Sequence, residues 1–339
     1  MSLYVFWFGM LGILLTGYAV LDGFDLGVGI LHMVLARDDR ERRVLLNSIG
    51  PLWDGNEVWL VTFGGALFAA FPRAYATVLS GFYLPVVVLL ACLIGRAISI
   101  EFRSKRKSPA WRTYWDVSFS LSSGLGVFVM GLLVGHVLRG VPLDEDGEYA
   151  GTFGDLFHPF PILVGALAVA TSALHGATYL CLKVEGELAV RAKSWAFRTF
   201  FVFLALYLAA SASTLATVPH ALDNFEHLPL AWIVVGLNVL AVANVPRTLH
   251  KGTPGWAFLS TGALICALTF LLAMAIFPNL LLDPVHPERS LTITSAASSE
   301  STLRLMRVIA LLGLPFIATY TFIVYWVFRG KTKIDTFSY

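Results

Sequence analysis

The chain has 339 residues, of which 57% are apolar, 13% aromatic and only 14% charged. A soluble chain carries about 25% charged residues, so this composition excludes an ordinary soluble domain and indicates an integral membrane protein. The net charge is only +2, and the basic residues cluster between apolar runs, which favours a membrane topology signal over a nucleic-acid partner. Cys92, Cys181 and Cys266 stand singly, so no cysteine-based metal site is expected.

Continuous apolar runs divide the chain into nine predicted transmembrane helices. A helix needs about 20 largely apolar residues to cross the hydrocarbon, and the ten-residue alternation of membrane strands is missing. In chain order the predicted spans are 3–35, 45–71, 75–101, 113–138, 159–183, 195–218, 229–246, 256–282 and 304–328. Most Lys and Arg residues fall on one side, which predicts an outside N-terminus and an inside C-terminus. The expected fold is a single all-α polytopic membrane domain.

Four carboxylic acids interrupt the first two predicted spans, where each costs several kcal/mol unless it is paired, protonated or hydrated. Asp22 and Asp25 lie three residues apart, as do Asp54 and Glu57, so each pair shares one helix face. Because the two spans run in opposite directions, Asp25 and Asp54 should both lie about 15 Å from the inner boundary. We therefore expect the four groups to converge at one level, where close acids share protons.

Neighbouring residues predict how these helices approach one another. Gly23 and Gly27 form a face of small residues that allows close packing, and Pro51 predicts a kink in the second span. Arg96, inside the third span, should pair with one of the acids. Binding of an anionic lipid or a cofactor carboxylate by Arg96 is the alternative.

The acid cluster has two interpretations, a proton relay or a set of hydrogen bonds that only hold helices together. Glu101 and Asp116 lie near the inner interface in the third and fourth spans. They either form an entry to the relay or extend toward the interface.

Three histidines, His32, His136 and His175, lie within predicted spans. His136 and His175 differ in depth by about 20 Å, so they cannot share one iron, and no HExxH or ExxH pattern accompanies any of the three. We expect each to make a polar contact and not to ligate metal. His175 is also a candidate for helix packing or for a proton path.

Several sequence segments now point to a family. They are DGFDLGVG at 22–29, GPLWDGNEVW at 50–59, GGALFAAF at 64–71, GRAISIEFR at 95–103, HGATYL at 175–180 and SLTIT at 290–294. Together they closely resemble subunit II of the cytochrome bd quinol oxidases. The similarity extends over the whole chain, and its most specific part is the first 105 residues.

The resemblance implies a partner, subunit I, which carries two b-type haems, one d-type haem and the quinol-oxidising loop. This chain would then ligate no haem or other metal. The complex would take quinol as its substrate and reduce oxygen to water with cytoplasmic protons, making a proton-motive force without pumping. The implied fold is two four-helix bundles plus a peripheral helix, in a bacterial or archaeal cytoplasmic membrane. Small single-helix accessory subunits, membrane lipid and quinone are further candidate partners.

The resemblance also implies roles for single residues. The acid matching Asp54 lies on a proton route to the haem d site, and the acids matching Asp22 and Asp25 are tied to assembly of the haem-bearing core. The tryptophan matching Trp59 is near an oxygen path. Relatives can carry Gln at the position of Glu57, so a charge there is not expected to be indispensable.

Three hypotheses follow. In the first, the chain supports subunit I and conducts cytoplasmic protons through Asp54, with Asp25, Asp22 and Glu57 as neighbours. In the second, it is a purely structural partner. In the third, it is a stand-alone proton-coupled transporter, because acids near the midplane and a broken helix are typical of such proteins.

Overall fold

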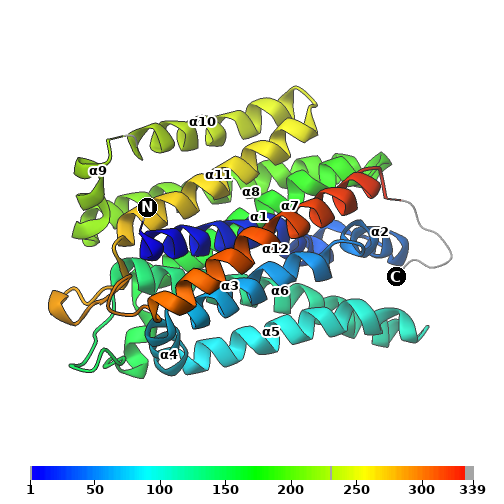
Figure 1. Cartoon of the computed structure of the whole chain (residues 1–339). Coiled ribbons are helices and arrows are strands. Elements are labelled where there is room, and N and C mark those ends of the chain that lie inside the picture. The colour runs from blue at the N-terminus through cyan, green and yellow to red at the C-terminus, as the bar shows by residue number, and fades with distance from the viewer. Residues whose placement is uncertain (1, 230, 333–339) are drawn as a thin grey trace.

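The computed structural model describes residues 2–229 and 231–332, and most of them are helical. The long helices run side by side along one direction (Figure 1). They are α1 (Leu3–Leu35), α3 (Trp53–Ala70), α5 (Tyr83–Phe102), α6 (Pro109–Arg139), α7 (Pro159–Lys183), α8 (Gly186–Thr217), α10 (Ala231–His250), α11 (Pro254–Ile276) and α12 (Glu300–Val327). The shorter helices are α2 (Asp39–Ile49), α4 (Pro72–Gly81) and α9 (Asp223–His227). Strands β1 (Asn279–Leu281) and β2 (Leu291–Thr292) pair antiparallel.

Eight of the described helices are individually long and apolar enough to cross a membrane. Helices α3 and α4 pass the same test only together, and they meet at a bend of 119°. Counting that bent pair as one span gives nine. The prediction of an all-α polytopic membrane protein is thereby confirmed.

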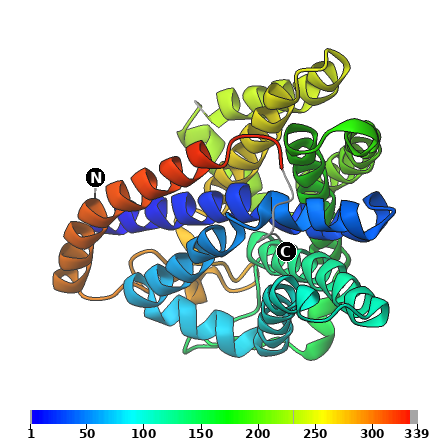
Figure 2. The ribbon, with the colours of Figure 1, turned by 90° about the vertical axis from the view of Figure 1, so that its right-hand side faces the viewer.

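Helix α1 lies at the centre of the molecule. It packs against a first group of helices, α3 and α6, and a second group, α7 and α11, while α6 and α7 also pack against each other. Helix α5 joins the first group through its contacts with α6, and α8 and α10 join the second through their contacts with α7 and α11. Helix α12 lies at the edge beside α1 and α3 (Figure 2). This arrangement places the N-terminal motifs at the junction of the two groups.

The predicted span 45–71 is not one helix, and no kinked helix passes through Pro51. Helix α2 ends at Ile49, a turn covers residues 50–52, and α3 begins at Trp53. Pro51 lacks the N–H that would continue the helical ladder, so the chain breaks there instead of bending. Leu45, Leu46 and Ile49 made the run look membrane-spanning, but they are the buried face of the otherwise polar helix α2.

Other predicted ends also differ from the structure. The predicted span 75–101 is divided between α4 and α5, and the predicted span 256–282 ends at Ile276, after which the backbone pairs in β1. Helix α8 starts at Gly186 instead of residue 195, because polar first turns extend the helix beyond its apolar run. Apolar runs therefore predict where the membrane-spanning helices lie, but not the residues at which those helices begin and end.

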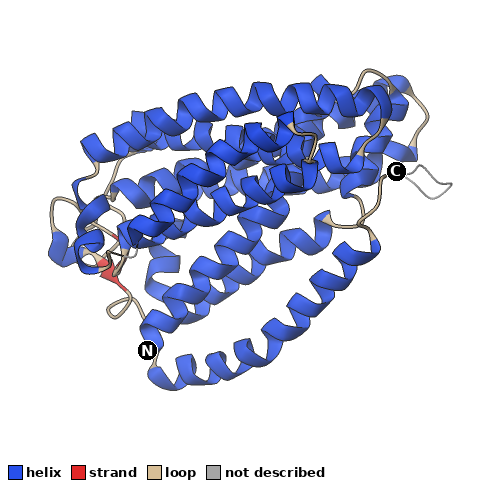
Figure 3. Cartoon of the chain, turned by 90° about the horizontal axis from the view of Figure 1, so that it is seen from above, coloured by secondary structure: helices blue, strands red, loops and turns tan. Residues whose placement is uncertain are grey.

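The molecule has two ends that we name by their contents. The α2 end holds α2 and the last described residues (Figure 1), and the hairpin end holds β1 and β2, drawn in red in Figure 3. The first residues of α1 lie at the hairpin end, as both Figure 1 and Figure 3 show. A site can therefore be located by its depth between these two ends.

Candidate functional site

A bidentate ion pair between α1 and α5 lies deep inside the protein. Nη1 of Arg96 donates to Oδ2 of Asp22 at 2.7 Å, and Nη2 donates to Oδ1 at 2.6 Å. Both side chains are fully buried. Two parallel charge-assisted bonds fix both groups, so the structure places Arg96 on an acid of this chain.

Asp25 lies one turn further along α1 and is also fully buried. Its Oδ2 accepts a hydrogen bond from Nδ2 of Asn56 at 2.7 Å, which joins α1 to the first turn of α3. Its Oδ1 has no hydrogen-bond partner among the described residues. The two buried acids therefore differ, because Asp22 is paired with a cation and Asp25 is held by one neutral donor.

The other two acids lie progressively closer to the surface. Glu57 is half-buried and interacts electrostatically with Arg96, Asp22 and Asp54. Asp54 is exposed in the first turn of α3, where the positive end of the helix dipole favours an anion. Asp54 is therefore not buried with Asp22 and Asp25, and the convergence of the four acids at one level stays a prediction. We call Asp22, Asp25, Asp54, Glu57 and Arg96 the acid site.

Close helix packing surrounds the acid site. A methyl group on Gly27 would lie 1.9 Å from the backbone oxygen of Ser172, so α1 and α7 are in backbone contact there. A methyl group on Gly23 would meet only His175, at 4.0 Å, which is ordinary contact. Of the two glycines predicted to allow close packing, only Gly27 lies where α1 and α7 approach closely.

Trp59 is half-buried on α3 and packs across α1. A methyl group on Gly17 would lie 2.2 Å from its ring, so the indole fills the space that the glycine leaves open. This contact joins α1 and α3 one turn of α3 beyond Asn56, which bonds to Asp25 of α1.

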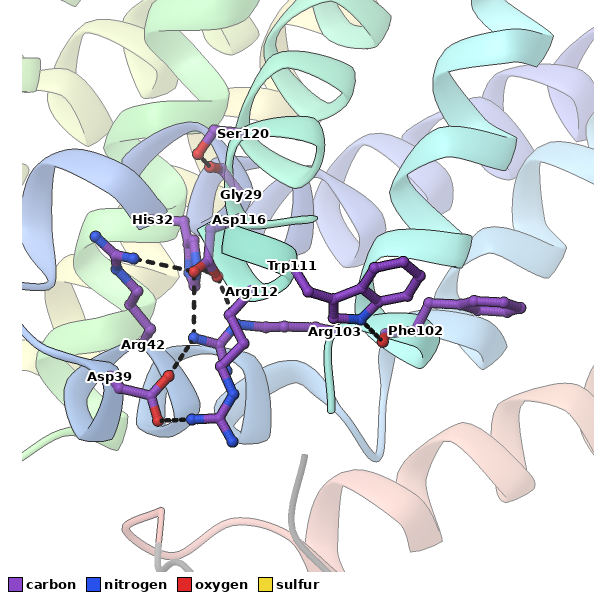
Figure 4. A network of polar contacts seen from close by, with 10 residues as sticks. All are labelled: Gly29, His32, Asp39, Arg42, Phe102, Arg103, Trp111, Arg112, Asp116 and Ser120. Carbon is purple, nitrogen blue, oxygen red and sulfur yellow. Dashed lines mark hydrogen bonds and ion pairs between the residues drawn. The ribbon is translucent and has the colours of Figure 1, made fainter. Parts of the chain in front are cut away.

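A second polar network lies at the α2 end (Figure 4). Asp116 of α6 is fully buried and accepts hydrogen bonds from His32 at 2.6 Å, Arg42 at 3.0 Å and Arg103 at 2.6 and 3.2 Å. Asp39 joins the same network. We call Asp39, Arg42, Arg103, Arg112 and Asp116 the arginine cluster.

Asp39 binds Arg103 and Arg112 from the first turn of α2, each at 2.8 Å. The arginine cluster thus connects α2 to the adjoining ends of α5 and α6. Asp116 lies inside this cluster and not at the surface, whereas Glu101 is exposed near the end of α5. The two residues grouped as a candidate proton entry therefore occupy different environments.

The histidines inside the spans are engaged by protein groups. His175 contacts Oγ1 of Thr261 at 2.6 Å and the carbonyl oxygen of Val20 at 3.0 Å, and its ring stacks on Phe258. His32 binds Asp116, and His136 contacts the carbonyl oxygen of Leu156 at 3.2 Å.

The three histidines thus contact other groups of the protein. Within residues 2–229 and 231–332, no group of three or more His, Cys, Asp or Glu side chains is arranged to hold a metal ion.

Sequence reasoning missed several residues of both networks. Tyr325, in the last turn of α12, donates a hydrogen bond to Oδ1 of Asn56 at 3.1 Å. Arg103 is fully buried, although its position among loop cations suggested only a topology signal. A usable signal was available in Asp39, an acid at the start of an amphipathic helix that is rich in arginine.

The fold and the buried ionic groups define a polytopic helical membrane subunit with titratable side chains between its central helices. The family described as cytochrome bd terminal oxidase subunit II matches residues 3–328. The chain belongs to this family.

Individual relatives agree over nearly the full length. Subunit 2 of the cytochrome bd-I ubiquinol oxidase of Escherichia coli is 35% identical over 97% of this chain and 95% of the relative. Subunit 2 of the cytochrome bd ubiquinol oxidase of Bacillus subtilis is 36% identical over 98% of this chain and 97% of the relative. A chain of the bd oxidase structure from Geobacillus thermodenitrificans matches with a TM-score of 0.80, covering 97% of this chain and 99% of that one. At 19% identity, this last match supports the fold alone.

Proposed function

We propose that the chain conducts protons within the oxidase complex. Membership of the family makes it subunit II of a cytochrome bd oxidase, an oxidoreductase complex that contains haem. In the proposal it supports subunit I, which holds the two b-type haems and the d-type haem, and it delivers cytoplasmic protons toward the site of oxygen reduction. Quinol is the proposed electron donor, and the proposed cycle does not pump protons.

The observation that carries the proposal is the graded exposure of the acid site. Asp54 is exposed, Glu57 is half-buried, and Asp22 and Asp25 are fully buried. Electrostatic interaction links Asp54 to Glu57, and Glu57 to Asp22. Ionisable groups inside a membrane protein mark ion and proton routes when they face other protein groups or water. The acids thus form a series from the surface of this chain to its centre.

The proposed orientation places the α2 end in the cytoplasm. Arg42, Arg103 and Arg112 lie at that end, as do Lys183 and Lys331 at the end of α7 and the start of the tail. Cationic side chains accumulate on the cytoplasmic side of membrane proteins. Protons would then reach Asp54 from the α2 end.

The surface of α3 that carries Asp54 supports contact with subunit I. Val58 is 50% exposed and Val61 is 71% exposed, and both share a helix face with Asp54 by spacing. An acid on a lipid-facing surface would be costly, so a protein partner that covers this face explains the arrangement. An oxygen path at Trp59, bound lipid or quinone, and small accessory helices belong to the same proposal.

Turnover of the assembled oxidase with Asp54→Asn tests the proposal. The change keeps the shape of the side chain and removes its titration, so turnover per haem should fall by about tenfold or more, which corresponds to about 1.4 kcal/mol in the barrier. Asp223→Asn is the matched control, because Asp223 is also an exposed acid in the first turn of a helix, α9. Unchanged turnover per haem in Asp54→Asn would refute the proton route.

The purely structural function has support of its own. The Asp22 and Arg96 pair and the arginine cluster both join helices through buried ion pairs. If the chain has only this structural function, variants of the acid site should lose haem content and activity in equal proportion. Activity per haem should then stay constant. Membership of a subunit family counts against the third hypothesis, a stand-alone transporter.

A further inference from the structure

Helix α12 is exposed along most of its length but is tied down near its last turns. Phe316 is 78% exposed and Tyr320 is 61% exposed. In contrast, Tyr325 packs against the main core cluster. Nζ of Lys183, at the end of α7, donates to the backbone oxygens of Phe328 and Gly330. Contacts at this end therefore set the position of Tyr325.

Tyr325 reaches the acid site through one side chain. Its hydroxyl group donates to Oδ1 of Asn56 at 3.1 Å. On the other side of the amide, Nδ2 of Asn56 donates to Oδ2 of Asp25 at 2.7 Å and to the backbone oxygen of Leu21 at 3.1 Å. The Leu21 oxygen can only accept, so the amide nitrogen must face α1 and the amide oxygen must face Tyr325. Three helices, α1, α3 and α12, meet in this chain of bonds.

We propose that Tyr325 is a positioning residue for proton transfer: by holding the Asn56 amide, it keeps Oδ2 of Asp25 occupied and leaves Oδ1 as the atom that takes up the proton. Oδ1 of Asp25 has no hydrogen-bond partner among the described residues, in agreement with this division of roles. In the transfer, the O–H bond at Oδ1 forms as the O–H bond of a hydronium ion breaks, and no electrons are exchanged. The inference rests on the proposed function, because it assumes that protons reach Asp25.

The test compares three variants of the assembled oxidase. Tyr325→Phe removes the hydroxyl group and keeps the packed ring. Tyr320→Phe removes a hydroxyl group from an exposed position of the same helix and is the matched control. Asp25→Asn identifies the carboxyl band of Asp25 in the infrared redox-difference spectrum by its loss. If Asp25→Asn fails to assemble, Asp25→Glu identifies the band by moving it.

We expect Tyr325→Phe to shift the Asp25 carboxyl band and to lower turnover per haem several-fold, with haem content unchanged. Tyr320→Phe should change neither quantity. An unmoved band with full turnover per haem in Tyr325→Phe overturns the inference, and so does a loss of haem content at constant activity per haem. Asp54→Asn is measured in parallel. If it lowers turnover per haem while Tyr325→Phe has no effect, only the inference fails. If Asp54→Asn keeps full turnover per haem, the proposed function fails.

Discussion

Two polar regions of the chain use the same residue types in opposite proportions. The acid site contains four carboxylic acids and a single arginine, Arg96, which is bonded to Asp22, whereas the arginine cluster contains two carboxylic acids and three arginines. Asp116 accepts hydrogen bonds from three side chains, and Asp25 accepts one, from Asn56.

The number of hydrogen-bond donors per carboxyl group distinguishes the two regions. A carboxylate with its lone pairs filled by charged donors is fixed in its ionised form and serves as a structural joint. A buried carboxyl group with an unused oxygen retains the capacity to bind a proton. The comparison is consistent with the proposed function, in which the arginine cluster joins helices and the acid site transfers protons beside the fixed Asp22 and Arg96 ion pair.

The largest expected effect on stability comes from breaking the ion pair between Asp22 and Arg96. Arg96→Gln leaves Asp22 buried without its cation, and loss of one member of a buried ion pair costs about 3–5 kcal/mol. The free energy of unfolding of the assembled oxidase, measured by titration with SDS, should fall by this amount. The double variant Asp22→Asn with Arg96→Gln should recover part of it. A double variant no more stable than Arg96→Gln would show that the pair is not the source of the loss.

Backbone contact beside the acid site gives the next effect. Gly27→Ala forces a methyl group onto the Ser172 oxygen, 1.9 Å away, and such overpacking costs about 1–3 kcal/mol or more. Gly23→Ala is the control, because the added methyl group would find ordinary contact. Thermal midpoints of the two oxidase variants, followed by haem absorbance, should differ clearly. Equal midpoints would contradict the close approach of α1 and α7.

A carboxyl group at the hairpin end extends the comparison to pH. Burial raises the pKa of Asp283, but N–H donation from Leu143, His286 and Val285 outweighs it, so its pKa lies below the ordinary value. This group therefore stabilises the folded state above its unfolded-state pKa of about 4, and the contribution is lost as pH falls through the lower folded-state value.

Asp283→Asn should accordingly lower the thermal midpoint at neutral pH, by the equivalent of roughly 1 kcal/mol for the weakened hydrogen bonds. The difference from the parent should shrink as the buffer is acidified. A difference that stays constant from neutral to acidic pH would exclude titration of Asp283 as its cause.

The smallest expected effect lies at the edge of the arginine cluster. The side chains of Arg112 and Asp39 are 30% and 44% exposed, and pairs near the surface contribute about 1 kcal/mol or less. Arg112→Gln should therefore leave turnover per haem unchanged and lower the unfolding free energy only slightly. A loss as large as that of Arg96→Gln would contradict the distinction between the interior and the edge.

Much of the fold could be predicted because long apolar runs must be helical in a membrane. The acids of the first helix were predicted as a buried group, since their cost in lipid demands partners. The break at Pro51 was harder to predict, because Leu45 and Leu46 look in the sequence like the start of a membrane-spanning run. Only the structure shows that they form the buried face of the polar helix α2. The exposure of Asp54 was not predicted, because it follows from the break at Pro51, which places Asp54 in the first turn of α3. The contact between Tyr325 and Asn56 joins residues 269 positions apart, and no local pattern encodes it.

Proton uptake during oxygen reduction tests the central claim most directly. The assembled oxidase is reconstituted in vesicles, and uptake from the side of the α2 end is followed with a pH-sensitive dye after a pulse of oxygen. Asp54→Asn should slow this uptake per haem by about tenfold or more, while Asp223→Asn should match the parent protein. Parental uptake in Asp54→Asn, at equal haem content, would contradict the claim that protons pass through the acid site.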